Sequence, residues 1–136
     1  MKYKFLPHTA DIKFQAFGKN PEEVFSNSAY ALFNSIHEGK IRSKIKKEIS
    51  VRGTDFENLL YNFLEEFLFL FDSEGFFLSK IKHIKIDPKK FILKCEIIGD
   101  FAGNYELSND VKAVTYNDMF VRNTDGKWTA QVVIDV

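Results

Sequence analysis

Two stretches at opposite ends of the chain carry the side chains with the clearest potential for chemistry. Near the start, Pro7–Asp11 (PHTAD) is a polar interruption that leads directly into an apolar-alternating segment. At the other end, the run QVVIDV places Asp135 next to the main-chain carboxylate of Val136. Carboxylates accept hydrogen bonds and can also bind cations. Taken alone, Pro7–Asp11 is best explained as a turn in which Asp11 accepts hydrogen bonds from backbone amides and His8 is a satisfied polar residue.

A second polar pair lies in the segment Val111–Tyr116 (VKAVTY), which otherwise has the apolar content of a strand. Lys112 and Thr115 interrupt it, and because they are three residues apart in a strand, their side chains point to opposite faces. A lysine in a strand is usually a solvated edge residue. Lys112 can therefore be explained as a solvated edge residue, or it can have a role in function.

Other catalytic signatures are missing from the sequence, which has no glycine-rich nucleotide loop and no serine or cysteine nucleophile elbow. His8, His37 and His83 lack the spacing of a zinc site. His37 and His83 are expected at the surface or at strand edges. Cys95 is the single cysteine and lies in an apolar-alternating segment, so it is predicted to be a small core residue and not a nucleophile.

The first element that must support these residues after the N-terminal strand is a helix. Asn20 is a suitable cap, and it is followed by a proline and two glutamates, the residue types that favour a helix start. Apolar residues then recur at helical spacing as far as Ile36. The helix is predicted to end near His37, with Gly39 as the stop signal.

A second and longer helix is predicted after Thr54–Glu57, which has the pattern of another capping box. Its apolar stripe extends to Phe71 and is widened by Phe69 and Leu70. Its last turns are therefore expected to be buried on several sides. Asp72–Gly75 (DSEG) is predicted to end it.

The rest of the chain is dominated by strand patterns. Strands are predicted at 12–17, 45–51, 77–86, 91–98, 111–116, 119–122 and 128–136. Asp87–Lys90 and Asn123–Lys127 are predicted hairpin turns. The order of helices and strands predicts an α+β fold in a single domain covering residues 1–136. About seven strands exceed what one face can bury, so two sheets are expected.

Composition excludes several classes of partner. Hydrophobic residues make up 45% of the chain, and 19 basic residues balance 19 acidic ones, so no global field attracts nucleic acid or membrane. The basic run Lys40–Lys47 is predicted to be a solvated loop and strand entry and not an RNA-binding patch. Phe67–Phe71 is far too short to span a bilayer, and the N-terminus lacks the apolar region of a signal peptide. The single cysteine fits a reducing compartment, so a cytoplasmic protein is expected.

Four blocks in this order resemble the archease family over essentially the whole chain. They are His8–Asp11 (HTAD), Leu70–Glu74 (LFDSE), Val111–Tyr116 (VKAVTY) and Trp128–Val136 (WTAQVVIDV). Two positions depart from the family pattern. Phe63 stands where archeases often carry tryptophan, which is a packing change. Asn117 stands where they often carry histidine, so no role of that histidine is carried over to this chain.

The resemblance implies a three-layer arrangement of two largely antiparallel sheets and a layer of two main helices, in agreement with the surplus of strands. It also implies that the protein is not an enzyme. Archeases are protein cofactors of the 3′-phosphate RNA-splicing ligase, which joins exon halves after tRNA intron removal. On this basis the protein is expected to promote guanylylation and multiple turnover of the ligase. It would meet RNA only indirectly, through the ligase, and it would have no membrane partner.

The resemblance further implies a divalent cation, often assigned as calcium, with Asp11, Asp135 and the main-chain carboxylate of Val136 as ligands. Three carboxyl groups brought together repel one another unless a cation neutralises them. Oxygen ligands of this kind suit calcium, magnesium or manganese better than zinc. The cation could pin the chain ends together or act beside the ligase active site. His8, Lys112 and Thr115 are candidates for contact with the ligase or its bound nucleotide.

Two other functions stay open. The first is a chaperone-like module for RNA-processing or RNA-modifying proteins, supported by the aromatic-rich long helix, whose phenylalanines are also explained simply as core. The second is a metal-dependent hydrolase or nuclease that uses the same carboxylates. The sequence disfavours the second, because it shows no basic substrate groove, no nucleophile and no oriented general base.

Overall fold

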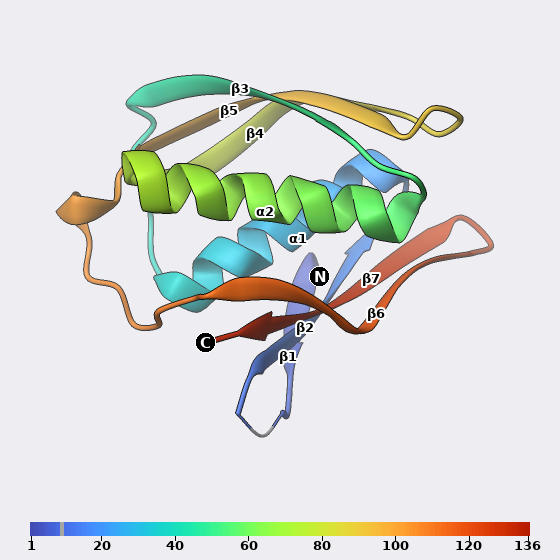
Figure 1. The fold of residues 1–136 in the computed structure, drawn as a ribbon, viewed down its shortest axis with the longest axis horizontal. Helices are drawn as coiled ribbons and strands as arrows, with labels where there is room; N and C mark the ends of the chain where they lie inside the picture. Colours follow the sequence, from blue (N-terminus) through green and yellow to red (C-terminus); the bar gives the residue numbers. More distant parts are fainter. Residues whose placement is uncertain (9) are drawn as a thin grey trace.

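The computed structural model describes residues 1–8 and 10–136. Its elements, in chain order, are β1 (Tyr3–Leu6), β2 (Ile12–Gly18), α1 (Pro21–Ile36), β3 (Ile45–Arg52), α2 (Phe56–Glu74), β4 (Phe76–Asp87), β5 (Ile92–Phe101), the short 3₁₀ helix η1 (Ala102–Asn104), β6 (Ala113–Thr124) and β7 (Lys127–Asp135). Both long helices lie between two sheets (Figure 1). The predicted α+β fold of three layers is confirmed.

The two sheets are built from different parts of the chain. The four-stranded sheet has the order β1-β2-β7-β6, and the three-stranded sheet has the order β3-β5-β4. Every strand pair is antiparallel. The first sheet thus joins the beginning of the chain to its end. Its central pair, β2 with β7, runs in register from Ile12 opposite Ile134 to Gly18 opposite Trp128.

The helix ends are only partly as predicted. Asn20 caps α1, and its side chain accepts a hydrogen bond from Glu23 N at 2.8 Å. α1 ends at Ile36 with His37 as its extended C-cap, as predicted, but Gly39 lies two residues beyond the cap and is not the residue that ends the helix. In α2 the helix does end at Gly75, which takes the left-handed conformation with φ 66°.

The start of α2 lies one residue later than the predicted capping box. Asp55 is the cap, and its side chain accepts a hydrogen bond from Asn58 N at 2.7 Å. Asn58 in return accepts one from Thr54 N at 3.0 Å. These two hydrogen bonds provide acceptors for the backbone amides of Thr54 and Asn58 at the start of the helix. Glu57 is thereby released for a different partner.

The predicted burial of the last turns of α2 is wrong at one position. Leu70 is buried, but Phe69 is 60% exposed. The apolar stripe here is wider than the part of the helix surface that the two sheets and α1 cover. Phe69 consequently faces outward, although its neighbours in sequence belong to the core.

Two strand predictions also need correction. β1 was not predicted, because its four residues alternate too briefly to be distinguished from a loop. The separate strands at 111–116 and 119–122 are one strand, β6, which is interrupted by a register shift between Thr115 and Phe120. Asp118 has φ 54° within this bulge, so polar residues typical of a turn lie inside a strand.

Side chains of α2 satisfy the free edge of β6. Glu65 accepts a hydrogen bond from Val114 N at 3.0 Å, and Glu57 accepts one from Val121 N at 2.9 Å. These two strand amides point away from β7 and have no partner in the ladder. The helix therefore fixes the position of β6 and covers part of its edge.

α1 provides the same support to the edge of the three-stranded sheet. Glu22 accepts a hydrogen bond from Ile86 N of β4 at 3.1 Å, and the Tyr30 hydroxyl accepts one from Ile81 N at 2.9 Å. Each helix thus bonds to the edge strand of one sheet through polar side chains. These bonds fix the helices relative to the sheets in a way that apolar packing alone does not.

Glu65→Ala is expected to lower the free energy of unfolding by about 1–3 kcal/mol, because it leaves the part-buried Val114 amide without an acceptor. Glu65→Gln keeps an acceptor oxygen and should cost less. The matched control is Glu66→Ala at the next position of α2, because the Glu66 side chain makes no hydrogen bond within the described residues. Urea denaturation of the three variants measures the difference. Equal losses in Glu65→Ala and Glu66→Ala would rule out a role for the edge contact.

Candidate functional site

The two acidic stretches singled out in the sequence lie at the same end of the four-stranded sheet. Ile12 of β2 pairs with Ile134 of β7. Continuing this register by one residue would place Asp11 opposite Asp135, and residues directly opposite in an antiparallel pair point to the same face. β6 reaches the same end of the sheet, since Ala113 pairs with Asp135. Three strand ends therefore meet where the carboxylates are predicted to bind a cation.

The backbone of β6 holds the end of β7 in place. Lys112 N donates a hydrogen bond to the carbonyl oxygen of Asp135 at 2.8 Å. The Asp135 side chain itself is exposed, whereas Val136 is half-buried and packs against the edge of the core. The last residues of the chain are thus fixed by pairing while the carboxylate of Asp135 stays accessible.

The N-terminal half of the candidate site contains an acid and a histidine. His8 Nδ1 lies 3.8 Å from Asp11 Oδ2, and both side chains are partly exposed. Thr9, which belongs to the same predicted block, lies outside the described residues. Lys13, two residues further along β2, is 3.5 Å from the carboxylate of Asp118, so its positive charge is directed towards a different acid.

A pocket of about 390 Å³ opens beside Asp11. It is bordered by the turn between β1 and β2, by the end of α1 and by the segment at residues 108 and 109. That segment is tied to the helix end, because Asn109 Nδ2 donates to Ser35 O at 2.6 Å and Ser108 N donates to Ile36 O at 2.7 Å. Asp11 therefore borders a recess that could accept an atom or small group from a partner.

Side chains alone do not complete a metal site in the described part of the chain. No group of three His, Cys, Asp or Glu side chains within residues 1–8 and 10–136 is arranged to hold an ion. A site at this end of the sheet would need a further oxygen donor, and the predicted set supplies one in the main-chain carboxylate of Val136. The donor set of Asp11, Asp135 and Val136 is all oxygen and fits a hard cation such as calcium.

The candidate contact residues of β6 have unequal roles in the fold. Thr115 Oγ1 donates to Val133 O at 3.0 Å and accepts a hydrogen bond from Asn117 N at 3.3 Å, so its hydroxyl stabilises the start of the bulge. Lys112 is exposed. Contact of His8, Lys112 and Thr115 with a partner stays a prediction.

Tyr116 of β6 follows Thr115, and its side chain packs against α2. Its ring stacks on that of Tyr61, with centroids 4.2 Å apart, and its hydroxyl accepts a hydrogen bond from Asn58 Nδ2 at 2.7 Å. The VKAVTY block therefore connects the sheet end to the helical layer. Its aromatic residue has a clear structural function.

Two buried groups with shifted pKa values belong to the fold. Burial raises the pKa of the Cys95 thiol to about 12, which keeps it protonated and confirms that it is a core residue. The Tyr105 hydroxyl donates to Asp100 at 2.7 Å and, together with the Phe101 amide, lowers the pKa of that carboxyl group. Asp100 thus fixes the chain around η1.

The histidine predictions have different outcomes. His83 is exposed and lies at the register shift of β4, as expected for a surface position. His37 is only half-exposed, because its ring lies 6.0 Å from that of Phe77 and 5.4 Å from that of Tyr105. Its Nδ1 is also 2.6 Å from Glu106 O. The surface prediction is therefore wrong in part for His37.

Sequence reasoning missed the polar residues that complete the pocket beside Asp11. Ser108 and Asn109 lie in a polar segment that shows no helical or strand periodicity. The density of hydrogen-bonding side chains in that segment was the available signal. Their partners at the end of α1 are about 70 residues away in the chain. A local sequence pattern cannot predict contacts over such a separation.

Neither helix in the described chain has the length and apolar content needed to cross a membrane. The fold and the acidic sheet end thus define a small three-layer α+β protein with its candidate site at one end of the four-stranded sheet. Residues 3–136 match the archease protein family (MTH1598/TM1083). The chain belongs to the archease family.

Individual relatives agree with this assignment. The chain is 41% identical to protein archease of Pyrococcus furiosus over 141 residues and 37% identical to that of Methanosarcina mazei over 140 residues, covering 99% of this chain in both cases and 99% and 96% of the relatives. The solution structure of Methanobacterium thermoautotrophicum protein 1598 is 33% identical, with a TM-score of 0.86 and 99% coverage of each chain. A Thermotoga maritima archease, described as a possible chaperone, is 21% identical with a TM-score of 0.69, covering 98% of this chain and 96% of that one, and supports the fold alone.

Proposed function

We propose that this protein is a cytoplasmic protein cofactor of the 3′-phosphate RNA-splicing ligase in tRNA splicing. It promotes guanylylation of the ligase and its multiple turnover, and it catalyses no reaction of its own. The observation that carries the proposal is the β2–β7 register, which brings the two acidic stretches of an archease chain to one end of a sheet.

Asp11, Asp135 and the main-chain carboxylate of Val136 would hold a divalent cation in this role. Calcium suits the all-oxygen donor set best, and magnesium or manganese also fit. The bound cation would supply a positive charge able to attract phosphate or carboxylate oxygens of the partner. The protein's own contribution is to fix the sheet end through the Lys112–Asp135 backbone bond and to leave the recess beside Asp11 open.

The described side chains support a non-enzymatic role. A nucleophile needs an adjacent base that is itself oriented by a third group. The Cys95 thiol is buried in the core, and the Thr115 hydroxyl is bonded to Val133 O. His8 has a carboxylate neighbour in Asp11. The two serines that border the pocket beside this pair, Ser35 and Ser108, both donate their hydroxyl groups to backbone oxygens of α1.

Asp11→Ala and Asp135→Ala should each reduce the stimulation of ligase guanylylation by at least about tenfold, as expected when a metal ligand is removed. Single-turnover guanylylation of the purified ligase, with and without each variant, measures this. Asp72→Ala, which removes an exposed carboxylate from the last turn of α2, is the matched control and should stimulate as well as wild type. If both sheet-end variants also stimulate fully, the site assignment is wrong.

A chaperone-like module for RNA-processing or RNA-modifying proteins is the second candidate. It is favoured by exposed aromatic side chains, of which Phe69 at 60% and Phe101 at 53% are the most exposed. A chaperone of this kind would protect several unrelated client proteins from aggregation, and the protection would not depend on Asp11 or Asp135. The same variants therefore separate the two functions, because only the ligase cofactor needs the acidic sheet end.

A further inference from the structure

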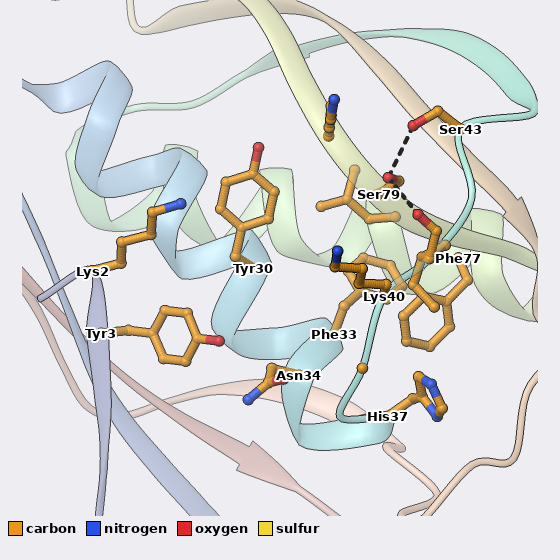
Figure 2. A pocket seen from close by; sticks show the side chains of 14 residues that line it. Lys2, Tyr3, Tyr30, Phe33, Asn34, His37, Lys40, Ser43, Phe77 and Ser79 are labelled. Carbon is orange, nitrogen blue, oxygen red and sulfur yellow. Dashed lines mark hydrogen bonds between the residues drawn. The ribbon is translucent and has the colours of Figure 1, made fainter.

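A separate pocket of about 630 Å³ lies beside α1. β1 and β4 are edge strands of their respective sheets, and the pocket lies between them. Tyr30, Phe33 and Asn34 of α1 line it, and the segment at residues 39–43 borders it (Figure 2). The pocket is thus built by parts of the chain that are distant in sequence.

The pocket concentrates positive charge in a chain whose net charge is zero. Lys2, Lys40 and Lys80 line it together with His37, and its lining includes no carboxylate. None of these three lysines belongs to an ion pair within the described residues. Glu38 is close enough to raise the pKa of Tyr3, but the three lysines outnumber this single carboxylate. The local potential is therefore positive and attracts anions.

Hydroxyl groups add hydrogen-bond donors to this charge. The Tyr30 hydroxyl accepts a hydrogen bond from Ile81 N at 2.9 Å, and its own hydrogen is left to donate. Burial raises the pKa of both Tyr30 and Tyr3, so both hydroxyls stay protonated at neutral pH. Ser79 and Ser43 are engaged with each other and with Ile41 O, and they fix the segment that borders the pocket (Figure 2).

Aromatic rings make up much of the remaining lining. Tyr3 approaches from β1 and Tyr30 from α1, with Phe33 and Phe77 beside them (Figure 2). Lys2 Nζ lies 5.4 Å from the centre of the Tyr30 ring, which holds a positive charge next to an aromatic surface. Such a pairing of lysines with flat rings suits a ligand that carries a phosphate group attached to a ring.

We propose that this pocket binds the phosphate and base of a nucleotide. Lysines bind phosphate as point charges, and tyrosines can stack on a base and donate hydrogen bonds to its acceptor atoms. Because lysines and no arginines line the pocket, a phosphate group would be bound by point charges and not by two-point contacts. The proposal does not depend on the ligase or on the acidic sheet end, although Asn34 borders both pockets.

Calorimetric titration of the full chain tests the proposal with three probes: inorganic phosphate, adenosine monophosphate and a short single-stranded RNA. The nucleotide should bind more tightly than phosphate, because only the nucleotide uses the aromatic lining. Lys40→Glu combined with Lys80→Glu should weaken nucleotide binding by at least about tenfold, because it replaces two attractive contacts to phosphate by repulsion. Both lysines are exposed, so the fold should tolerate the exchange.

The matched control is Lys89→Glu combined with Lys90→Glu, which reverses two exposed charges in the turn between β4 and β5. It makes the same change in net charge and should leave binding nearly unchanged. Tighter binding of RNA than of the mononucleotide would assign the ligand to RNA, and equal binding would assign it to free nucleotides. No nucleotide binding, binding no tighter than that of phosphate, or an equal loss in the control would overturn the proposal.

Discussion

Phe67→Ala is expected to lower the free energy of unfolding by about 3–5 kcal/mol, the range measured for phenylalanine removed from a tightly packed core. The Phe67 ring is fully buried in the helical layer. The centre of its ring lies 4.9 Å from that of Phe63 in the same helix and 5.5 Å from that of Phe33 in α1. The ring centre of Phe33 in turn lies 4.8 Å from that of Phe77 in β4. Its removal leaves a cavity where both helices and one sheet meet.

Phe69→Ala is the matched control, because it makes the same chemical change two residues further along the same helix. The side chain of Phe69 is 60% exposed, so its removal should change stability by no more than about 0.5 kcal/mol. Urea or thermal denaturation of both variants provides the comparison. Similar losses in the two variants would show that Phe69 is covered by a contact that this structure does not contain.

The helices and hairpins could be predicted because their signals are local. Asn20 caps α1 as expected, and the turn at Asp87–Lys90 joins β4 to β5. The predicted number of strands was correct, although one predicted pair proved to be a single strand and β1 was missed. A bulge cannot be distinguished from a turn by residue type, because both favour short polar side chains with φ above zero.

The edge contacts of the helices could not be predicted in the same way. Glu57 belongs to the predicted capping box and Glu65 has the spacing of a solvated helix face, so nothing in the sequence indicates that both accept hydrogen bonds from β6. Such contacts depend on the distance between layers, which is set by the whole core. For the same reason, the exposure of Phe69 followed only from the arrangement of the sheets.

The residues of the candidate site could be proposed from the sequence, but their common position in the fold could not. Periodicity identified 12–17 and 128–136 as strands but gave no reason to pair them across more than 110 residues. The resemblance to archeases suggested that Asp11 and Asp135 act together, and the β2–β7 register shows that their strands end side by side. The second pocket was not predicted. Lys40 belongs to a basic run that was interpreted as a solvated loop and not as an RNA-binding patch, and Lys2 and Lys80 come from two other segments of a chain with balanced charge.

Asp11→Asn and Asp135→Asn are each expected to weaken calcium binding by at least about 100-fold, or about 2.7 kcal/mol. Each variant replaces a charged oxygen ligand by a neutral amide of nearly the same shape. Calcium at 100 times its dissociation constant should stabilise the wild-type fold by about 2.7 kcal/mol, because only the folded chain brings the sheet ends together. The variants should lose most of this stabilisation.

The prediction reverses when a chelator removes calcium. Without a cation, carboxylates at the ends of paired strands repel each other, so either asparagine variant should then be at least as stable as the wild type. Thermal unfolding in calcium and in chelator, together with calcium titration, measures both effects. Asp125→Asn, at the hairpin turn at the far end of the same sheet, is the control and should not alter calcium binding.

The main-chain ligand can be tested in the same assay. Extending the chain beyond Val136 by a glycine and a serine converts its carboxylate into an amide, while the pairing of β7 up to Asp135 is retained. Calcium binding should weaken as it does in Asp135→Asn, with unfolding in chelator unchanged. Full calcium affinity in the extended chain would remove Val136 from the ligand set. Full affinity in Asp11→Asn would instead show that the two chain ends do not share one cation.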